Sequence, residues 1–150
     1  MLTRLTLATA LSLASFTPAL AAEMIDKVSP YSVSETLDRL ETAVEKAGAT
    51  VFARVDHAAG AEKVEMDLRP TQMLMFGNPK LGTPAMLDAQ TVGLDLPLRV
   101  LAYADDEGQV HVTYHDPAAL IETHGVPQDA DYIAKMSGAL GKLTDAAIAE

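Results

Sequence analysis

The chain has no cysteine and no tryptophan, and only 11 of its 150 residues are Lys or Arg. Without cysteine there is no disulfide framework, no thiolate-bound zinc or iron–sulfur centre and no cysteine nucleophile. The 21 Asp and Glu residues give a formal net charge of −10, which argues against a nucleic-acid partner because phosphate binding requires a basic surface. The HExxH and Gly-x-Ser-x-Gly patterns are also missing, so the sequence carries neither of these zinc-protease and serine-hydrolase signatures.

What remains is the composition of a folded domain. Hydrophobic residues make up 49% of the chain, which is too many for a disordered polypeptide. The length corresponds to about one domain, and no repeat, linker or low-complexity tract divides it. A chain of this size can build a core that needs no disulfides.

The first 21 residues have the order of a secretory signal peptide. Residues 1–4 carry one positive charge, residues 5–16 are apolar or small, and Ala19-Leu20-Ala21 is a small-x-small cleavage motif. The apolar stretch is too short and too rich in Ala, Ser and Thr for a transmembrane span, and an uncleaved anchor helix is the alternative. The sequence predicts a signal peptide over residues 1–21, a domain over 22–150, and a periplasmic or secreted protein that is not inserted in a membrane after cleavage.

Helical and alternating patterns predict an α+β fold. Ser32 and Glu35 form a capping box, followed by apolar residues on one helical face. Residues 71–76 are apolar on both faces, as in a central strand, and Thr83 before Pro84 predicts that a short helix begins there, after a loop. The predicted order is β-α-β-β-α-β-β-α-α, with strands near residues 25–28, 50–56, 71–76, 98–104 and 109–114. This indicates a single two-layer domain with a mixed or antiparallel sheet of about five strands.

Five short motifs follow one another in a distinctive order and spacing. They are Asp56-His57-Ala58-Ala59, Phe76-Gly77-Asn78-Pro79-Lys80-x-Gly82-Thr83-Pro84, Asp95-Leu96-Pro97-Leu98, Tyr114-His115-Asp116-Pro117 and His124-Gly125. In these motifs the chain resembles the DUF302 family of bacterial and archaeal domains. His115 stands where that family usually has Asn, and Thr123 where Arg is common. The resemblance implies a compact α+β domain that tends to self-associate, and it implies no established activity.

Histidines and carboxylates stand at the ends of several predicted strands. We expect the strands at 25–28, 50–56 and 109–114 to run one way and the other two to run the opposite way, as in ferredoxin-like packing. This arrangement brings six polar residues to one edge of the sheet: His57, Asp95, Tyr114, His115, Asp116 and His124. Imidazole and carboxylate groups together can bind a ligand or a divalent metal, or relay a proton. The alternative is that His57 and His124 only cap a strand end and a helix end.

The segment 77–83 is a secondary candidate, for an anion. The spacing of Gly77, Gly82 and Thr83 resembles that of a phosphate-loop motif, but the Lys that the motif has between its last Gly and the Thr is absent here. The candidate contacts are Asn78, Lys80 and Thr83, and we expect them at the opposite edge of the sheet, some 20 Å from the histidines. The alternative is a loop that only turns the chain.

Met73 and Met75 share one face of a predicted strand. Thioether pairs favour Cu(I), whereas methionine also fills cores and interfaces readily. The flanking residues Leu74 and Phe76 favour packing.

Two classes of function remain. One is a non-enzymatic, exported binding or interaction module for an unknown small ligand, which forms a homo-oligomer and most simply a dimer. Residues 73–76 are apolar on both faces, and Leu101 and Tyr103 lie on a half-apolar face of the predicted hairpin. The predicted helices cover one side of the sheet most easily, so the other side favours a partner. The alternative is that the helix beginning at Asp129 covers it. The other is a small periplasmic enzyme or metal-binding protein that uses the His/Asp cluster. No cofactor is specified by the sequence.

Overall fold

The structure, a computed structural model, describes residues 24–150. The predicted signal peptide lies outside the described residues. Within them, one five-stranded sheet has the order β1-β5-β4-β3-β2, and all neighbouring strands are antiparallel. The single α+β domain predicted from the sequence is confirmed, with the sheet purely antiparallel.

The elements follow the predicted order, with short helices added. The strands are β1 (Met24–Ser29), β2 (Thr50–Asp56), β3 (Thr71–Gly77), β4 (Leu98–Ala104) and β5 (Val110–His115). The helices are α1 (Val33–Lys46), α2 (His57–Glu62), α3 (Pro79–Asp88), α4 (Ala119–His124) and α5 (Asp131–Ile148), with a 3-10 helix η1 (Gln90–Leu94). As the capping box predicts, the Ser32 hydroxyl accepts a hydrogen bond from the Glu35 amide, at 3.2 Å.

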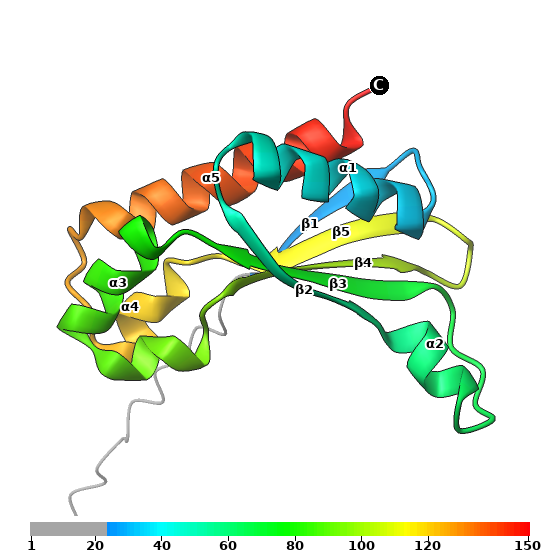
Figure 1. The fold of residues 1–150 in the computed structure, drawn as a ribbon, viewed down its shortest axis with the longest axis horizontal. Coiled ribbons are helices and arrows are strands. Elements are labelled where there is room, and N and C mark those ends of the chain that lie inside the picture. The colour runs from blue at the N-terminus through cyan, green and yellow to red at the C-terminus, as the bar shows by residue number, and fades with distance from the viewer. Residues whose placement is uncertain (1–23) are drawn as a thin grey trace, which may run out of the picture.

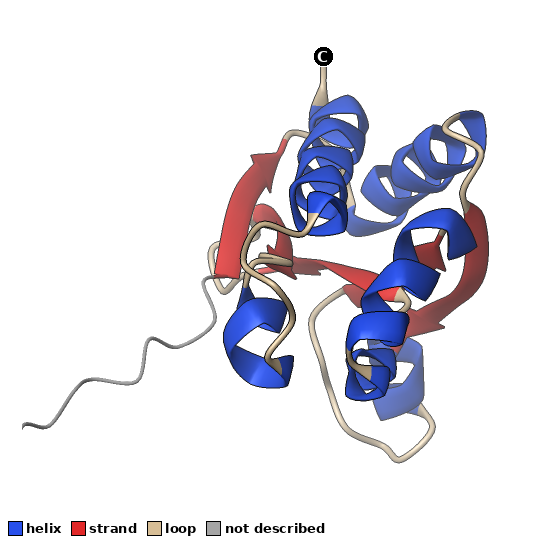
Figure 2. Cartoon of the chain, turned by 90° about the vertical axis from the view of Figure 1, so that its left-hand side faces the viewer, coloured by secondary structure: helices blue, strands red, loops and turns tan. Residues whose placement is uncertain are grey.

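The main core lies between the sheet and two long helices. Both α1 and α5 run across the same face of the sheet, side by side (Figures 1 and 2). Leu37 and Leu40 of α1 and Leu140 of α5 are buried there against Leu74 and Phe76 of β3. This explains why β3 is apolar at these positions, since the helix-covered face excludes water.

A second cluster closes one end of the sheet. Here α3, η1 and α4 pack against the first turns of α5, with Ala85, Val92 and Met136 buried between them. The Tyr132 hydroxyl donates to Asp88 at 2.8 Å. Burial, reinforced by this hydrogen bond, raises the pKa of Tyr132 to about 12. This cluster positions the loops that build the candidate site.

The predicted strand directions are wrong for the last two strands. The observed antiparallel pairing makes β1, β2 and β4 run one way and β3 and β5 the other. The connection from β3 to β4 does not cross the sheet, because α3 and η1 stay at its end in the second cluster. The helix-covered face is already occupied by α1 and α5, so β4 returns directly beside β3.

The predicted loop over 77–83 is also wrong. The helix α3 begins at Pro79, and the Asn78 side chain caps it by accepting from the Lys80 amide at 3.0 Å. Pro84 therefore lies inside the helix rather than at its start. Asn-Pro at a helix start satisfies the same capping rule as Thr-Pro, and the earlier of the two signals is the one used.

The face opposite the long helices is open. Among the described helices none lies across it (Figure 1). We call this side of the five-stranded sheet the uncovered face. Its apolar centre is formed by six half-buried residues of β2, β3 and β4: Ala53, Val55, Met73, Met75, Leu101 and Tyr103. Beside it, residues 57–70, called the arm, project from the end of β2 and return to β3. No described helix is long and apolar enough to cross a bilayer.

Candidate functional site

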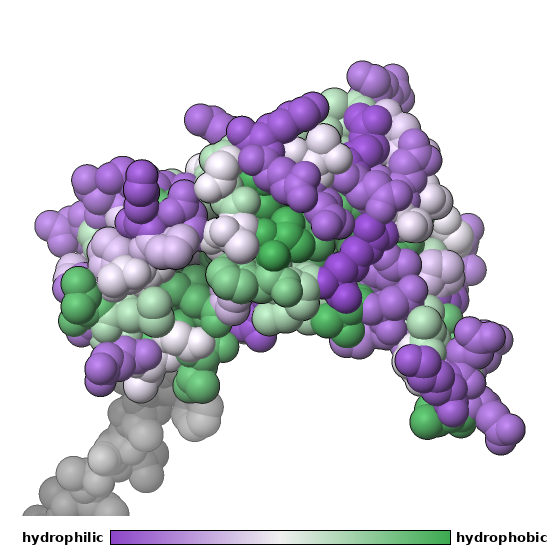
Figure 3. Space-filling model, in the orientation of Figure 1, coloured by the Kyte–Doolittle hydropathy of each residue, from purple (hydrophilic) through white to green (hydrophobic). Residues whose placement is uncertain are grey.

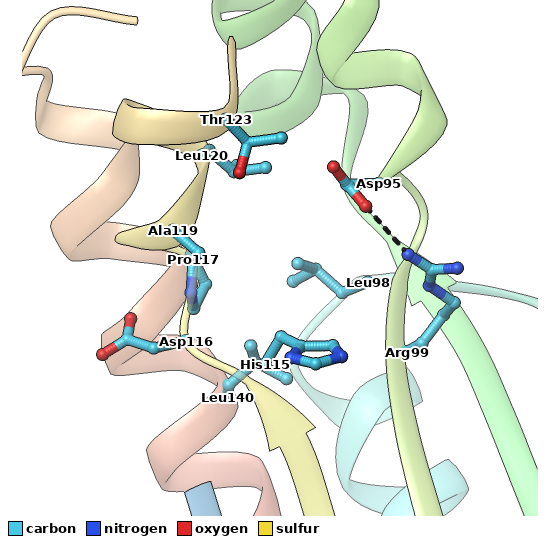
Figure 4. A pocket seen from close by; sticks show the side chains of 10 residues that line it. All are labelled: Asp95, Leu98, Arg99, His115, Asp116, Pro117, Ala119, Leu120, Thr123 and Leu140. Atoms are coloured by element: carbon cyan, nitrogen blue, oxygen red, sulfur yellow. Dashed lines mark hydrogen bonds and ion pairs between the residues drawn. The ribbon is translucent and has the colours of Figure 1, made fainter. Parts of the chain in front are cut away.

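A pocket of about 200 Å³ opens where β4 begins and β5 ends, next to α4. We call it the edge pocket (Figure 4). Its lining residues come from β4, the end of β5, α4 and α5: Asp95, Leu98, Arg99, His115, Asp116, Pro117, Ala119, Leu120, Thr123 and Leu140. Three of the six residues predicted to meet at one edge therefore line a common pocket, and a fourth, His124, contacts Asp95 from behind it.

Asp95 is held from two sides. Its Oδ2 lies 2.6 Å from Nε2 of His124, and its Oδ1 lies 3.1 Å from Nη2 of Arg99. The other ring nitrogen of His124 lies 2.9 Å from the hydroxyl of Thr91 in η1. Only 5% of the His124 side chain is exposed, against 38% for Asp95. His124 is therefore a buried bridge that fixes Asp95 and η1 relative to α4.

Arg99 and His115 face each other across neighbouring strands. They lie two residues beyond the paired positions Leu101 and Thr113, so the pleat places both on the same side of the sheet. In Figure 4 the imidazole projects from the end of β5 towards the side of the pocket that carries Arg99, while the guanidinium is turned towards Asp95. Among the described residues the His115 ring makes no hydrogen bond or ion pair. The pocket thus presents two basic side chains that are not fully paired.

Asp116 and Tyr114 are structural rather than pocket-facing. The Asp116 carboxylate accepts from the Ala118 amide and the Ser137 hydroxyl, both at 2.9 Å, and it points away from the pocket centre (Figure 4). Tyr114 is buried in the main core. Asp116 therefore ties the end of β5 to the start of α4 and to α5, while Tyr114 fixes β5 in the core.

His57 lies at the other edge of the sheet, contrary to the predicted arrangement. It is the first residue of α2, directly after Asp56 at the end of β2. The sheet is about 20 Å long at this point, because the first and last of the seven residues of β3 are six steps of ~3.4 Å apart. The reversed direction of β4 and β5 is the cause, since it moves their ends with Asp95 and His115 away from His57.

The residues predicted to bind an anion share the edge with the edge pocket, not the opposite edge. Asn78 is used as the cap of α3, and Lys80 is exposed. Thr83 and Asn78 line a separate pocket of about 250 Å³ whose other walls are largely apolar, Phe52 and Met86 among them. An apolar wall does not favour a free anion.

No group of three or more His, Asp or Glu side chains in residues 24–150 converges in a way that could hold a metal ion. Met73 and Met75 lie on the uncovered face. Their cross-strand neighbours are Val55 and Leu101 for the first, and Ala53 and Arg99 for the second. These neighbours favour packing rather than Cu(I) ligation, because none is a thiolate, thioether or imidazole.

His111 forms a separate polar cluster beside the hairpin. Its ring nitrogens lie 2.8 Å from Asp26 and 3.2 Å from Asp105, and the ring stacks on Tyr103 with centroids 5.2 Å apart. The hydrogen bond with Asp26 raises the pKa of His111 above its ordinary value, although burial opposes the shift, and Asp105 adds to it. Burial would raise the pKa of Asp105, but hydrogen bonds from the Gln109 amide and from His111 outweigh it and lower that pKa. The cluster ties β1 to the β4–β5 hairpin.

Sequence reasoning missed Arg99 and Thr91. An arginine in a strand pattern is typical of a solvated face, so nothing local marked it. Only the neighbouring positions of β4 and β5 in the sheet bring Arg99 and His115 to one pocket, and only the position of η1 brings Thr91 to His124.

Comparison with known proteins decides the family. Residues 25–143 match the family described as "Domain of unknown function DUF302". The chain belongs to the DUF302 family. The crystal structure of an uncharacterized conserved DUF302 protein from Bacillus stearothermophilus has the same fold, with a TM-score of 0.76, and the match covers 85% of this chain and 99% of that one. At 20% sequence identity, this likeness concerns the fold alone.

Curated relatives of this DUF302 domain are longer proteins. The chain is 44% identical over 107 residues to the fluoride-specific ion channel FluC 1 of Brucella suis biovar 1 (strain 1330), and the match covers 71% of this chain and 42% of the relative. It is equally similar to FluC 1 of Brucella abortus biovar 1 (strain 9-941), where the match covers 40% of the relative. The match therefore spans about two fifths of the length of these relatives, and more than half of each lies outside it.

Proposed function

We propose that this DUF302 domain is a non-enzymatic, self-associating binding module that acts outside the cytoplasm after residues 1–21 are removed. The observation that carries the proposal is the arm. None of residues 57–70 is buried, and three large apolar side chains on it, Val64, Met66 and Leu68, are 65%, 67% and 45% exposed. An apolar segment of this kind is typical of an interface.

The arm is anchored firmly at its base. The Asp56 carboxylate caps α2 through the Ala59 amide at 2.9 Å and accepts from Gln72 at 3.1 Å. At the return, Arg69 donates to the Ala104 carbonyl at 3.0 Å. A segment fixed at both ends holds its apolar residues in place, which lowers the entropic cost of binding a partner.

The arm borders the uncovered face, and a second copy of the chain would cover both. Figure 3 shows the molecule hollowed beneath the sheet, between the arm and the group formed by α3 and α4, with apolar surface at the tip of the arm. The face spans five strands and is about 20 Å long, roughly 400 Å² in projection. A standard interface buries about 800 Å² per partner, so the sheet alone is too small and the arm supplies the remainder.

The charge distribution on the uncovered face supports pairing between identical copies. Its centre, around Leu101 and Met73, is uncharged, whereas Asp26 and Arg99 lie nearer the rim. An apolar centre with a polar rim is the usual anatomy of an interface. In a two-fold pairing through this centre, Leu101 of each copy meets its own counterpart.

The Brucella relatives support the role of a module. In those proteins, a segment 44% identical to this chain is part of a longer protein.

Light scattering of the purified protein at micromolar concentration tests the proposal. We expect twice the mass of one mature chain, which is smaller than the 15.9 kDa of the full sequence because residues 1–21 are removed. Replacing the three arm residues, in the triple variant V64S/M66S/L68S, should shift the mass to that of the monomer. Because these side chains are exposed, their replacement should not destabilise the fold of the single chain.

A matched control is available at the opposite end of the molecule. Leu87 and Leu94 are 81% and 78% exposed and lie in α3 and η1, away from the arm. The double variant L87S/L94S should retain the dimer mass. A monomer mass for the unmodified protein, or equal masses for the two variants, would contradict the proposal.

A further inference from the structure

We propose that the edge pocket binds a small aliphatic carboxylate, whose charged group pairs with Arg99 and His115 while its hydrocarbon part packs against Leu98, Leu120 and Leu140. The proposal does not depend on self-association. It follows from the charge, the volume and the apolar floor of the pocket.

On the side of the pocket formed by Asp95, Arg99 and His115, hydrogen-bond donors outnumber acceptors. Asp95 is shared between Arg99 and His124, so it does not fully neutralise the guanidinium. Arg99 has five N–H donors, and its only hydrogen bond to a described side chain runs from Nη2 to Asp95. His115 supplies at least one further donor, whichever its tautomer. An added carboxylate group would meet two basic side chains, a geometry that favours charge-assisted hydrogen bonds.

The acceptors that could attract a cation are already used. The Asp116 carboxylate is engaged by Ala118 and Ser137 and is turned away from the pocket. Asp95, the one carboxylate that faces the pocket, lies against two basic groups. A cation would therefore lie close to Arg99 without a free carboxylate to compensate, which Coulomb repulsion disfavours.

The remaining walls select for a hydrocarbon chain. Leu98, Leu120, Leu140 and Pro117 are among the lining residues. In Figure 4 Leu120 projects from α4, and Leu98 lies between it and Arg99. A volume of about 200 Å³ equals roughly seven water molecules at ~30 Å³ each. This is the size of a carboxylate with a few methylene groups. Inorganic phosphate would leave the leucines in contact with water and so lose the hydrophobic contribution.

Calorimetric titration with sodium butyrate, in a buffer free of carboxylate and phosphate, tests the proposal directly. We expect saturable binding of one butyrate per chain. Affinity should rise about fourfold for each methylene added between acetate and butyrate, and inorganic phosphate should bind more weakly than butyrate.

Two substitutions give opposite results only if the ligand is an anion. R99Q removes a charged donor and should weaken butyrate binding about tenfold or more. D95N removes the internal competitor for Arg99 and should leave binding as strong or stronger. Arg69, an exposed arginine at the other edge, provides the matched control R69Q, which should bind as the unmodified protein does.

Three outcomes would overturn the proposal. One is the absence of saturable butyrate binding at millimolar concentration. Another is a loss of binding in D95N with no loss in R99Q, which would indicate a cationic ligand. The third is equal affinity for acetate and butyrate, which would remove the role of the leucines. Repeating the titration on V64S/M66S/L68S separates this proposal from self-association, since that variant should bind butyrate normally.

Discussion

Replacing His124 with phenylalanine should destabilise the frame of the edge pocket measurably. The substitution keeps an aromatic ring in a site where only 5% of the side chain is exposed. It removes the contacts of both ring nitrogens, at 2.9 Å to Thr91 and 2.6 Å to Asp95. Because these contacts join α4 to η1 and to the start of β4, their loss should affect the fold as well as the pocket.

The size of the effect follows from the exposure of the partners. Each hydrogen bond contributes about 0.5–1.5 kcal/mol net. Thr91 is exposed and Asp95 is 38% exposed, so both can bond to water in the variant and neither becomes an unpaired buried group. The ion-pair component with Asp95 is correspondingly small. We therefore expect H124F to lower the free energy of unfolding by about 1–2 kcal/mol, or the melting temperature by about 4–8 °C.

Urea denaturation followed by far-ultraviolet circular dichroism measures this change. A double-mutant cycle with T91A isolates the contact between Thr91 and His124, since the two residues touch and their effects should not add. If H124F changes the free energy of unfolding by less than about 0.5 kcal/mol, the bridge does not hold the pocket together. The reasoning would also be refuted if the effects of H124F and T91A were strictly additive.

Two further predictions concern pH and the N-terminus. Because the pKa of His111 is raised in the folded state, first by its hydrogen bond with Asp26, its contribution to stability is complete below the ordinary value of 6.5 and is lost as pH rises through the folded-state pKa. The stability advantage over H111Q, measured in urea, should therefore shrink as pH increases, and a constant difference would contradict this. Deleting residues 1–21 should leave the melting temperature unchanged, and the intact mass of exported protein should correspond to a chain that begins at Ala22. A large loss of stability would mean that those residues belong to the core.

Local sequence signals account for most of the fold. The capping box at Ser32, confirmed by its hydrogen bond to Glu35, marks the start of α1 because it describes contacts within one turn. The two-sided apolar pattern of residues 71–76 correctly predicts an interior strand, since β3 lies between β2 and β4. Signals of this kind depend only on near neighbours in the chain.

Strand direction depends on what the helices between strands pack against, and no local pattern reports that. Gly82 illustrates the difficulty. Together with Gly77 it suggested a loop, yet it lies inside α3, where an added Cβ would come within 3.2 Å of the Leu96 side chain. The glycine allows close packing between α3 and the segment before β4. Packing between two segments that are distant in the sequence therefore explains the glycine at position 82, and the local loop that the sequence suggested does not.

The reversed direction of β4 and β5 has a consequence for function. It separates His57, the first residue of the arm, from the other five residues expected at the same edge, of which Asp95, His115 and Asp116 line the edge pocket about 20 Å away. The surface proposed for self-association thus extends from one edge of the sheet, and the pocket proposed for a carboxylate opens at the other. Substitutions more than about 10 Å apart with no shared partners have independent effects. Changing the arm should therefore remove the proposed self-association and leave the edge pocket unaltered, whereas Arg99 also lies near the rim of the uncovered face.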